Sequence, residues 1–218
     1  MRSTPVEAAG LRAHWDDVYR RLGPEKASWY QAIPTTSLEL IETIGVDRSA
    51  GIIDVGGGAS PLAATLTGRG FADLTVLDLS TVALAAAAGT GPDPVRRLQG
   101  DVRHWTPDRR YDLWHDRAVF HFLTDPADRA RYAQVLRQAS HPGSHVIVAT
   151  FAPDGPTSCS GLPVCRYEPD ELTAALGGGL HLLVTRHADH TTPGGATQPF
   201  TWIAAHVREP HTRRATTG

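Results

Sequence analysis

The chain has 218 residues, of which 41% are apolar and 20% are charged, and its formal net charge is −2 at pH 7. This length predicts a single domain with a short extension at one or both ends. The balance of charge argues against the basic surface that nucleic-acid backbones require, and no apolar run approaches the ~18 residues of a membrane span. We therefore expect neither a nucleic-acid partner nor a membrane partner.

The cysteines, the histidines and the amino-terminal residues exclude further classes of protein. The amino terminus lacks the apolar segment and small-residue cleavage site of a secretory signal, so the cytoplasm is the expected compartment. Cys159 and Cys165 are too few for a disulfide framework. The 11 histidines are scattered along the chain and not spaced as metal ligands, so we expect no metal site.

Two helices are expected within the first 45 residues. Apolar residues at helical spacing predict an amphipathic helix over 11–22, ended by Gly23 and Pro24. A second helix is predicted over 36–44, with Thr36 as its N-cap and Glu39 completing a capping box. We assign residues 1–45 to an N-terminal helical cover, 46–208 to the main domain and 209–218 to a flexible tail.

From Gly51 onward, short apolar runs alternate with helical stretches. Strands are predicted at 52–55, 74–77, just before Asp101, at 111–114 and at 145–151, with helices at 61–68, 81–88 and 127–138 between them. This alternation predicts an α/β fold, a Rossmann-like doubly wound sheet that is mostly parallel, with helices on both faces. After a helix at 169–176, the runs 180–185 and 200–207 have a short link and must pair antiparallel.

The predicted strands end on acidic residues. In a doubly wound sheet, ligands bind beyond the carboxyl ends of the strands, and here Asp54, Asp78, Asp101 and Asp116 come at or just after those ends. Carboxylates that converge on one edge are costly unless a ligand uses them. This edge is therefore the predicted ligand site.

A glycine-rich turn follows the first strand. A dinucleotide fingerprint needs a third glycine at position 61, where this chain has proline, and Asp54 would repel phosphates. The pattern D-x-G-x-G lets the backbone approach a ligand without a pyrophosphate and turns Asp54 toward a cationic amino group. Asp78 is placed to accept ribose hydroxyls, and Asp101 to accept from an adenine amine. An adenosine that carries an ammonium and a sulfonium meets all these demands.

At these residues the chain resembles the class I S-adenosylmethionine-dependent methyltransferases, over about residues 48–207. The resemblance implies S-adenosyl-L-methionine as cofactor and a seven-stranded sheet whose last strand is inserted antiparallel. It also implies cofactor contacts from Asp54, Gly56, Gly57, Gly58, Asp78, Leu79, Asp101 and Val102. The fourth motif, 112–116, ends near the methyl group. Ser60 departs from the glycine pattern, and His115-Asp116-Arg117-Ala118 replaces the Asn/Asp-Pro-Pro-aromatic run of base methyltransferases.

Aromatic residues near the amino terminus resemble the cover of small-molecule and thiol methyltransferases. Trp15 and Tyr19 are predicted either to cover the sulfonium by a cation–π contact or to form one stripe that packs the helix on the sheet. No helical period explains Trp29 and Tyr30, so we expect them to bind the acceptor.

Four further residues are candidates for the chemistry. His121 is the first candidate for a general base, and Asp116 for orienting it or touching the cofactor; the alternative is that His121 packs between phenylalanines. Arg117 is expected to bind an acidic substrate or to pair with Asp116 or Asp125. His190, in the turn of the final hairpin, is a candidate second wall of the acceptor pocket or a solvated turn residue. The loop 152–167 is expected to shape that pocket, with Cys159 as a small loop residue.

The sequence thus predicts a methyltransferase that acts in line on a small-molecule thiol, hydroxyl, amine or carboxylate. A protein lysine methyltransferase is the first alternative, and it predicts an open groove. A non-catalytic S-adenosylmethionine-binding protein is the second. The acceptor atom, the need for a base and the oligomeric state stay open.

Overall fold

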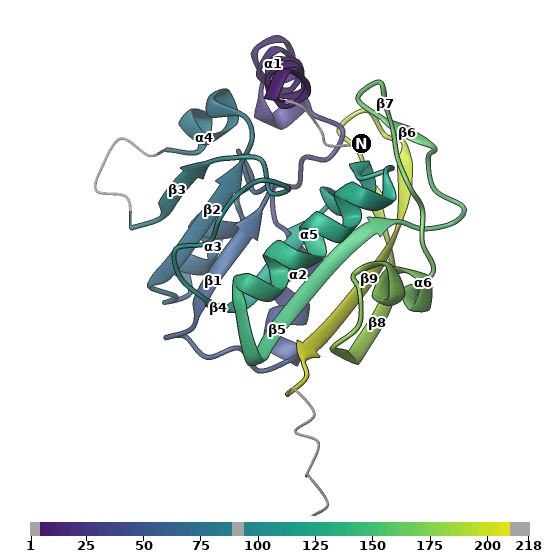
Figure 1. The fold of residues 1–218 in the computed structure, drawn as a ribbon. Coiled ribbons are helices and arrows are strands. Elements are labelled where there is room, and N and C mark those ends of the chain that lie inside the picture. The colour runs from purple at the N-terminus through teal and green to yellow at the C-terminus, as the bar shows by residue number, and fades with distance from the viewer. Residues whose placement is uncertain (1–4, 89–93, 210–218) are drawn as a thin grey trace, which may run out of the picture.

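The structure is a computed structural model that describes residues 5–88 and 94–209, with side chains described from residue 9 (Figure 1). Its helices are α1 (Pro5–Leu22), η1 (Pro24–Lys26), α2 (Thr35–Thr43), α3 (Leu62–Gly68), α4 (Thr81–Ala87), η2 (Phe120–Phe122), α5 (Pro126–Gln138) and α6 (Pro169–Ala175). Its strands are β1 (Gly51–Val55), β2 (Asp73–Asp78), β3 (Arg96–Gln99), β4 (Tyr111–Arg117), β5 (Ser140–Phe151), β6 (Ser158–Cys159), β7 (Leu162–Pro163), β8 (Leu180–Thr191) and β9 (Thr197–Val207).

A seven-stranded sheet in the order β3-β2-β1-β4-β5-β9-β8 forms the centre of the molecule. The first five of these strands pair in parallel, and β9 pairs antiparallel with both β5 and β8. This confirms the predicted α/β fold and its antiparallel insertion. The chain order reverses between β1 and β4, which is where ligands bind in sheets of this kind.

Successive residues of each central strand face opposite layers, so one sheet supports two cores. Ile52 packs with residues of α2 and α3 on one face, whereas the next residue, Ile53, packs with residues of α5 and α6 on the other. Figure 1 looks onto the α5 side of the sheet. Because β1 is apolar on both faces, it is buried along its whole length and holds the following turn firmly.

Three local features differ from the prediction. The capping box at Thr36 is wrong: Pro34 is the N-cap of α2, so the helix begins at Thr35 and Thr36 lies inside its first turn. A capping box forms instead at the start of α6, between Glu168 and Glu171. The loop 152–167 contains the small β6–β7 hairpin, and β8 runs on to Thr191.

Helix α1 lies across the end of the sheet toward which β1 and β2 point (Figure 1). Asp16 fastens it there: its Oδ1 accepts hydrogen bonds from the hydroxyl of Ser80 at 2.7 Å and from the backbone N–H of Val82 at 3.2 Å. Ser80 is also the N-cap of α4, so one buried carboxylate joins α1 to the start of α4. The helix is thereby held over the strand ends.

None of the helices in the described ranges has the length and hydropathy that crossing a bilayer would take. The predicted tail, 209–218, lies outside the described residues except for Glu209.

Candidate active site

Two adjoining cavities, of about 130 and 50 Å³, open at the carboxyl ends of the strands. They share Tyr19, Trp29, Val55, Gly56 and Arg117 as lining residues. The larger is also lined by Asp78, Leu79, Asp101, Val102, Arg103, Phe122 and Cys159, and the smaller by Tyr30, Ser37, Asp54, Gly57 and His115. Most of the predicted cofactor residues therefore come together at one place.

The turn after β1 accepts only glycine. Gly56 has φ +69°, and a Cβ there would lie 2.0 Å from Cγ2 of Val119. A Cβ on Gly57 would lie 2.3 Å from Oδ2 of Asp54, and one on Gly58 would lie 2.6 Å from Oδ2 of Asp78. The missing side chains let the backbone pass directly beside both carboxylates, which is the close approach expected from the motif.

Asp54 has one oxygen in use and one unused. A carboxylate can only accept, so Nδ1 of His115 donates to Oδ1 of Asp54 at 2.7 Å, while Nε2 of His115 lies 3.0 Å from Oγ of Ser37. Oδ2 of Asp54 is buried and has no hydrogen-bond partner in the described chain. The geometry fits a cationic donor at Oδ2, the predicted role of Asp54.

The sequence named His115 within the fourth motif but did not predict its contact with Asp54, and it did not connect Ser37 with this site. The one signal for His115 is its register: β1 and β4 pair with Asp54 opposite His115. Strand register across a parallel pair cannot be read from spacing along the chain. Ser37 comes from α2, which the sequence connected only with the cover.

Asp78 ends β2 and lines the larger cavity. Its Oδ1 accepts from the backbone N–H of Ser80 at 2.7 Å. Burial raises the pKa of this carboxyl to about 7, an effect that the Ser80 hydrogen bond opposes and the nearby charges of Asp54 and Asp16 reinforce. A buried acceptor at this position suits a pair of hydroxyl donors.

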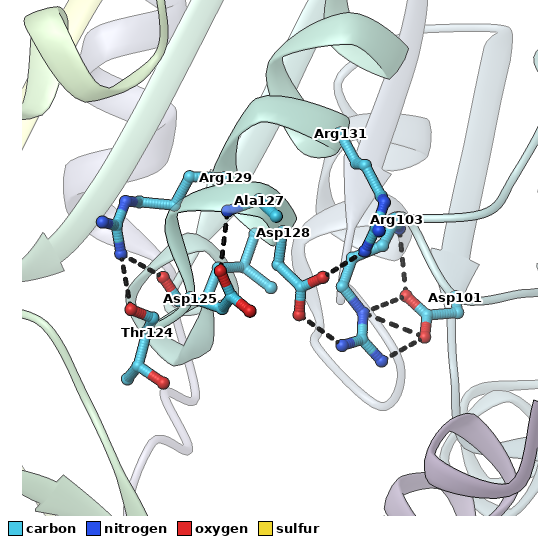
Figure 2. A network of polar contacts seen from close by, with 9 residues as sticks. Asp101, Arg103, Thr124, Asp125, Ala127, Asp128, Arg129 and Arg131 are labelled. Carbon is cyan, nitrogen blue, oxygen red and sulfur yellow. Dashed lines mark hydrogen bonds and ion pairs between the residues drawn. The ribbon is translucent and has the colours of Figure 1, made fainter. Parts of the chain in front are cut away.

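Asp101 differs from the expectation. Both of its oxygens accept from the guanidinium of Arg103, which also donates to Asp128 at 2.7 Å, and Arg131 donates to Asp128 in turn (Figure 2). The network ties the segment after β3 to α5 and brings Arg103 to the cavity wall. Asp101 lines the cavity, but its carboxylate is already occupied, so contact with an adenine amine stays a prediction.

Asp116 was predicted to be catalytic, and the structure contradicts this. It is fully buried, and neither cavity reaches it. Its Oδ2 accepts from the hydroxyl of Tyr132 at 2.6 Å and the N–H of Phe120 at 3.1 Å, while Oδ1 accepts from the N–H of Val119 at 2.8 Å. Burial raises the pKa of Asp116 to about 6, with these hydrogen bonds opposing the rise. The carboxylate holds the β4–η2 turn.

His121 is likewise sealed off. It has no exposed surface, its ring lies 4.4 Å from the ring of Phe122 and 4.7 Å from that of Phe151, and it lines neither cavity. Both ring nitrogens are buried without a partner in the described chain. Burial, and then the charge of Arg117, lower its pKa to about 3. The packing alternative is therefore favoured, and His121 is not placed to act as a base.

The aromatic residues of the predicted cover lie above the strand ends. The ring of Trp15 meets those of Trp29 at 5.7 Å and Phe122 at 5.2 Å, edge to face, and the indole N–H of Trp29 donates to the hydroxyl of Tyr19 at 3.3 Å. Both helix aromatics line the larger cavity, so the stripe on the sheet is the less suitable interpretation. Tyr30 lines the smaller cavity.

His190 is not in the hairpin turn. It lies near the end of β8, is buried, and donates from Nε2 to the carbonyl of Ser28 at 2.7 Å. It thereby holds the segment that carries Trp29, without lining either cavity. Cys159, interpreted from sequence as a plain loop residue, does line the larger cavity.

The structure distinguishes between the two roles expected for Arg117. It pairs with neither Asp116 nor Asp125; its Nη1 donates to the carbonyl of Trp29 at 2.8 Å, and its guanidinium carbon lies 5.1 Å from the centroid of the Phe200 ring. Burial lowers the pKa of Arg117 to about 10, so the side chain keeps its charge at neutral pH. A cation thus stands at the boundary of the two cavities.

Comparison with known protein families identifies one segment of the chain. A family model described as a methyltransferase domain matches residues 52–143, the segment with β1 to β4 and the glycine turn. Residues 52–143 are a methyltransferase domain. For this segment, the family and enzyme class expected from the sequence are thereby confirmed. No curated protein matches the chain significantly.

Solved structures with the same fold are distant in sequence. A 1,6-didemethyltoxoflavin-N1-methyltransferase from Burkholderia thailandensis superposes with a TM-score of 0.71 at 18% identity, covering 96% of this chain and 92% of that one. An S-adenosylmethionine-dependent methyltransferase from Anabaena variabilis gives 0.70 at 14% identity, covering 94% and 96%. A glycopeptide N-methyltransferase complexed with sinefungin gives 0.62 at 17% identity, covering 83% and 96%. The chain therefore shares the fold of these solved structures well beyond residues 52–143.

Proposed function

We propose that the protein transfers a methyl group from S-adenosyl-L-methionine to a small-molecule nucleophile. The observation that carries the proposal is the convergence of Asp78, the unpartnered Oδ2 of Asp54 and the glycine turn on two adjoining cavities under the aromatic cover. Together they provide acceptors for ribose hydroxyls, an acceptor for an ammonium group and a backbone that a ligand can approach closely.

The residues present fit this cofactor group by group. Asp78 would hold the ribose, Leu79 and Val102 would form apolar walls for adenine, and Gly56 and Gly57 with Asp54 would receive the methionine end. Trp15 and Tyr19 would cover the sulfonium with their rings, which favours a cation by ~0.5–2 kcal/mol. S-adenosylmethionine as cofactor is supported by the methyltransferase domain and by related folds solved with it bound.

Methyl transfer depends more on the position of the acceptor than on proton transfer. When bound, the cofactor supplies an electrophilic methyl on a sulfonium, whose sulfur takes the electron pair of the broken bond as the acceptor forms its own bond to carbon. Among the described residues, one histidine lines a cavity: His115 lines the smaller one, and both of its ring nitrogens are in use. We infer that the protein orients and desolvates the acceptor, and that the acceptor brings its own lone pair as a thiolate, carboxylate or amine.

The cover favours a small acceptor over a protein side chain. Trp15, Tyr19 and Trp29 close over the cavity, and Asp16 fastens α1 in that position. A protein lysine would need an open groove along the strand ends. We therefore retain residues 1–45 as a cover for a domain formed by 46–208. The structurally similar 1,6-didemethyltoxoflavin-N1-methyltransferase of Burkholderia thailandensis, solved with 1,6-didemethyltoxoflavin bound, agrees with this choice.

The test is calorimetric titration with S-adenosylmethionine and S-adenosylhomocysteine, with NAD as a control ligand. The proposal would be supported if both sulfur compounds bind and NAD does not, and if mass spectrometry then detects methylation of small thiols, amines or acids. Absence of binding at millimolar concentration would refute the cofactor assignment. Binding without turnover on any small acceptor, together with methylation of lysine peptides, would favour the protein substrate.

A further inference from the structure

The cation at the boundary of the two cavities is incompletely compensated by the protein. Arg117 lines both cavities, and within the described residues no carboxylate lies in ion-pair contact with it. Nη1 donates to the carbonyl of Trp29, while Nε is buried without a hydrogen-bond partner. A desolvated charge is costly unless an anion compensates it, so this position calls for one.

The ionisable groups around Arg117 do not supply that anion. Burial, and then the charge of Arg117 itself, lower the pKa values of His121 and His190, which keeps both rings neutral at neutral pH. Burial raises the pKa of the Cys159 thiol, which keeps it protonated. The charge of the Asp54 carboxylate reaches Arg117, but the two side chains form no ion pair, and Oδ1 of Asp54 is engaged by His115.

The surroundings of Arg117 place it on the acceptor side of the site. Its guanidinium stacks over Phe200 of β9, which lies two strands beyond β4, on the far side from β1 and β2 with their cofactor residues. The charge of Arg117 also interacts with Cys159 of β6 and with His190 of β8. Trp29, which the sequence assigned to the acceptor, holds Nη1.

We propose that Arg117 binds a carboxylate of the methyl acceptor, so that the substrate class is small organic acids. This rests on the proposed function and narrows it. The guanidinium is planar and suited to a carboxylate, and the Phe200 ring and the Trp29 carbonyl fix its plane. The aromatic walls of the larger cavity would receive the apolar part of such an acid.

The first arm of the test uses phenylacetate and its uncharged counterpart, phenylacetamide, as probes. Ligand-observed NMR would compare the two with the wild-type protein, with and without S-adenosylhomocysteine. We expect phenylacetate to bind at least about tenfold more tightly than phenylacetamide. Arg117→Met should abolish the preference, and Arg117→Lys should retain part of it. Equal binding of both probes to the wild type, or an unchanged preference in Arg117→Met, would overturn the proposal.

The matched control and the second arm separate this proposal from others. Arg69→Met makes the same change at an exposed ion pair with Glu42, and it should leave the preference intact. Calorimetry should find the S-adenosylhomocysteine affinity of Arg117→Met within about threefold of wild type. A loss of tenfold or more would show that Arg117 binds the cofactor's own carboxylate, which overturns the proposal.

Failure of the wild type to bind S-adenosylhomocysteine would instead break the proposed function. The probe preference, measured without that ligand, would still decide the role of Arg117. Circular dichroism and thermal melting would establish that both Arg117 variants are folded.

Discussion

Asp78 and Asp116 occupy equivalent positions, near the carboxyl ends of β2 and β4, yet the protein uses them in opposite ways. Both are buried, and burial raises both pKa values, to about 7 and about 6. Asp116 is surrounded by three donors, two backbone N–H groups of the following turn and the hydroxyl of Tyr132, whereas Asp78 receives, within the described chain, only backbone N–H groups and faces a cavity. One acid completes the fold, and the other is left available to a ligand.

The difference shows that an acidic strand end is not by itself evidence of a site. What separates the two acids is the supply of donors within hydrogen-bond reach. Tyr132 of α5 and the η2 turn provide them to Asp116, whereas Asp78 has the backbone N–H groups of Ser80 and Gly58 and, among the described residues, no side-chain donor. Substitutions at the two positions should therefore separate stability from binding.

The largest effect is expected from Asp116→Ala. It leaves the Tyr132 hydroxyl and two backbone N–H groups buried without an acceptor, at ~1–3 kcal/mol each, so the free energy of unfolding should fall by at least ~3 kcal/mol. Urea unfolding would measure this loss. Tyr132→Phe, which removes one of the three donors, should cost less. Near-wild-type stability of Asp116→Ala would disprove the structural role.

A change of opposite sign is expected from Asp78→Asn. The pKa of Asp78 is raised from 3.8 to about 7, so its contribution to stability is present below pH 3.8 and is lost as the pH rises through about 7. The amide that replaces the carboxyl would not ionise, so the variant would keep its stability as the pH rises. The variant should be more stable than wild type by ~2–4 kcal/mol at pH 8, with the gap growing from pH 4 to 7 and then levelling off.

Urea unfolding of both proteins at several pH values between 5 and 8 would measure that gap. A gap that is independent of pH would mean that Asp78 does not titrate in this range. A variant less stable than wild type at pH 8 would show that the Ser80 hydrogen bond outweighs the buried charge.

Ligand binding should respond to Asp78→Ala. Losing an acceptor of two ribose hydroxyls should weaken S-adenosylhomocysteine binding by about tenfold to a hundredfold in calorimetry, without loss of stability. Asp73→Ala is the matched control, since it removes an exposed acid at the other end of the same strand. Equal affinities of Asp78→Ala and wild type would mean that the ribose lies elsewhere.

How far the sequence predicted this molecule depends on the range of the interactions. The alternation of apolar runs and helices predicted the sheet, because β1 and its neighbours are buried on both faces and show it in composition. The glycine turn and Asp78 were also predicted, because their signal is local. Thr36 was misjudged, since Pro34 moved the helix start by one residue.

The rest of the site depends on contacts between distant segments. His115 meets Asp54 through strand register, Ser37 joins them from α2, and Arg103 reaches Asp128 across the top of the sheet. No spacing along the chain encodes these distances. The choice between an acid with internal donors and one without is of the same kind, so Asp78 and Asp116 looked alike in sequence.

The smallest effect is expected at His121, the residue that the sequence ranked first for catalysis. His121→Leu replaces a neutral ring, packed between Phe122 and Phe151, with an apolar side chain that has no nitrogens to leave unpartnered. Stability should change by less than about 1 kcal/mol, and turnover and cofactor affinity by less than about twofold. Steady-state kinetics and thermal unfolding would measure both. A tenfold fall in turnover with cofactor affinity intact would restore His121 as a base, and it would require a motion that opens the η2 turn, because a sealed ring cannot take a proton from an acceptor.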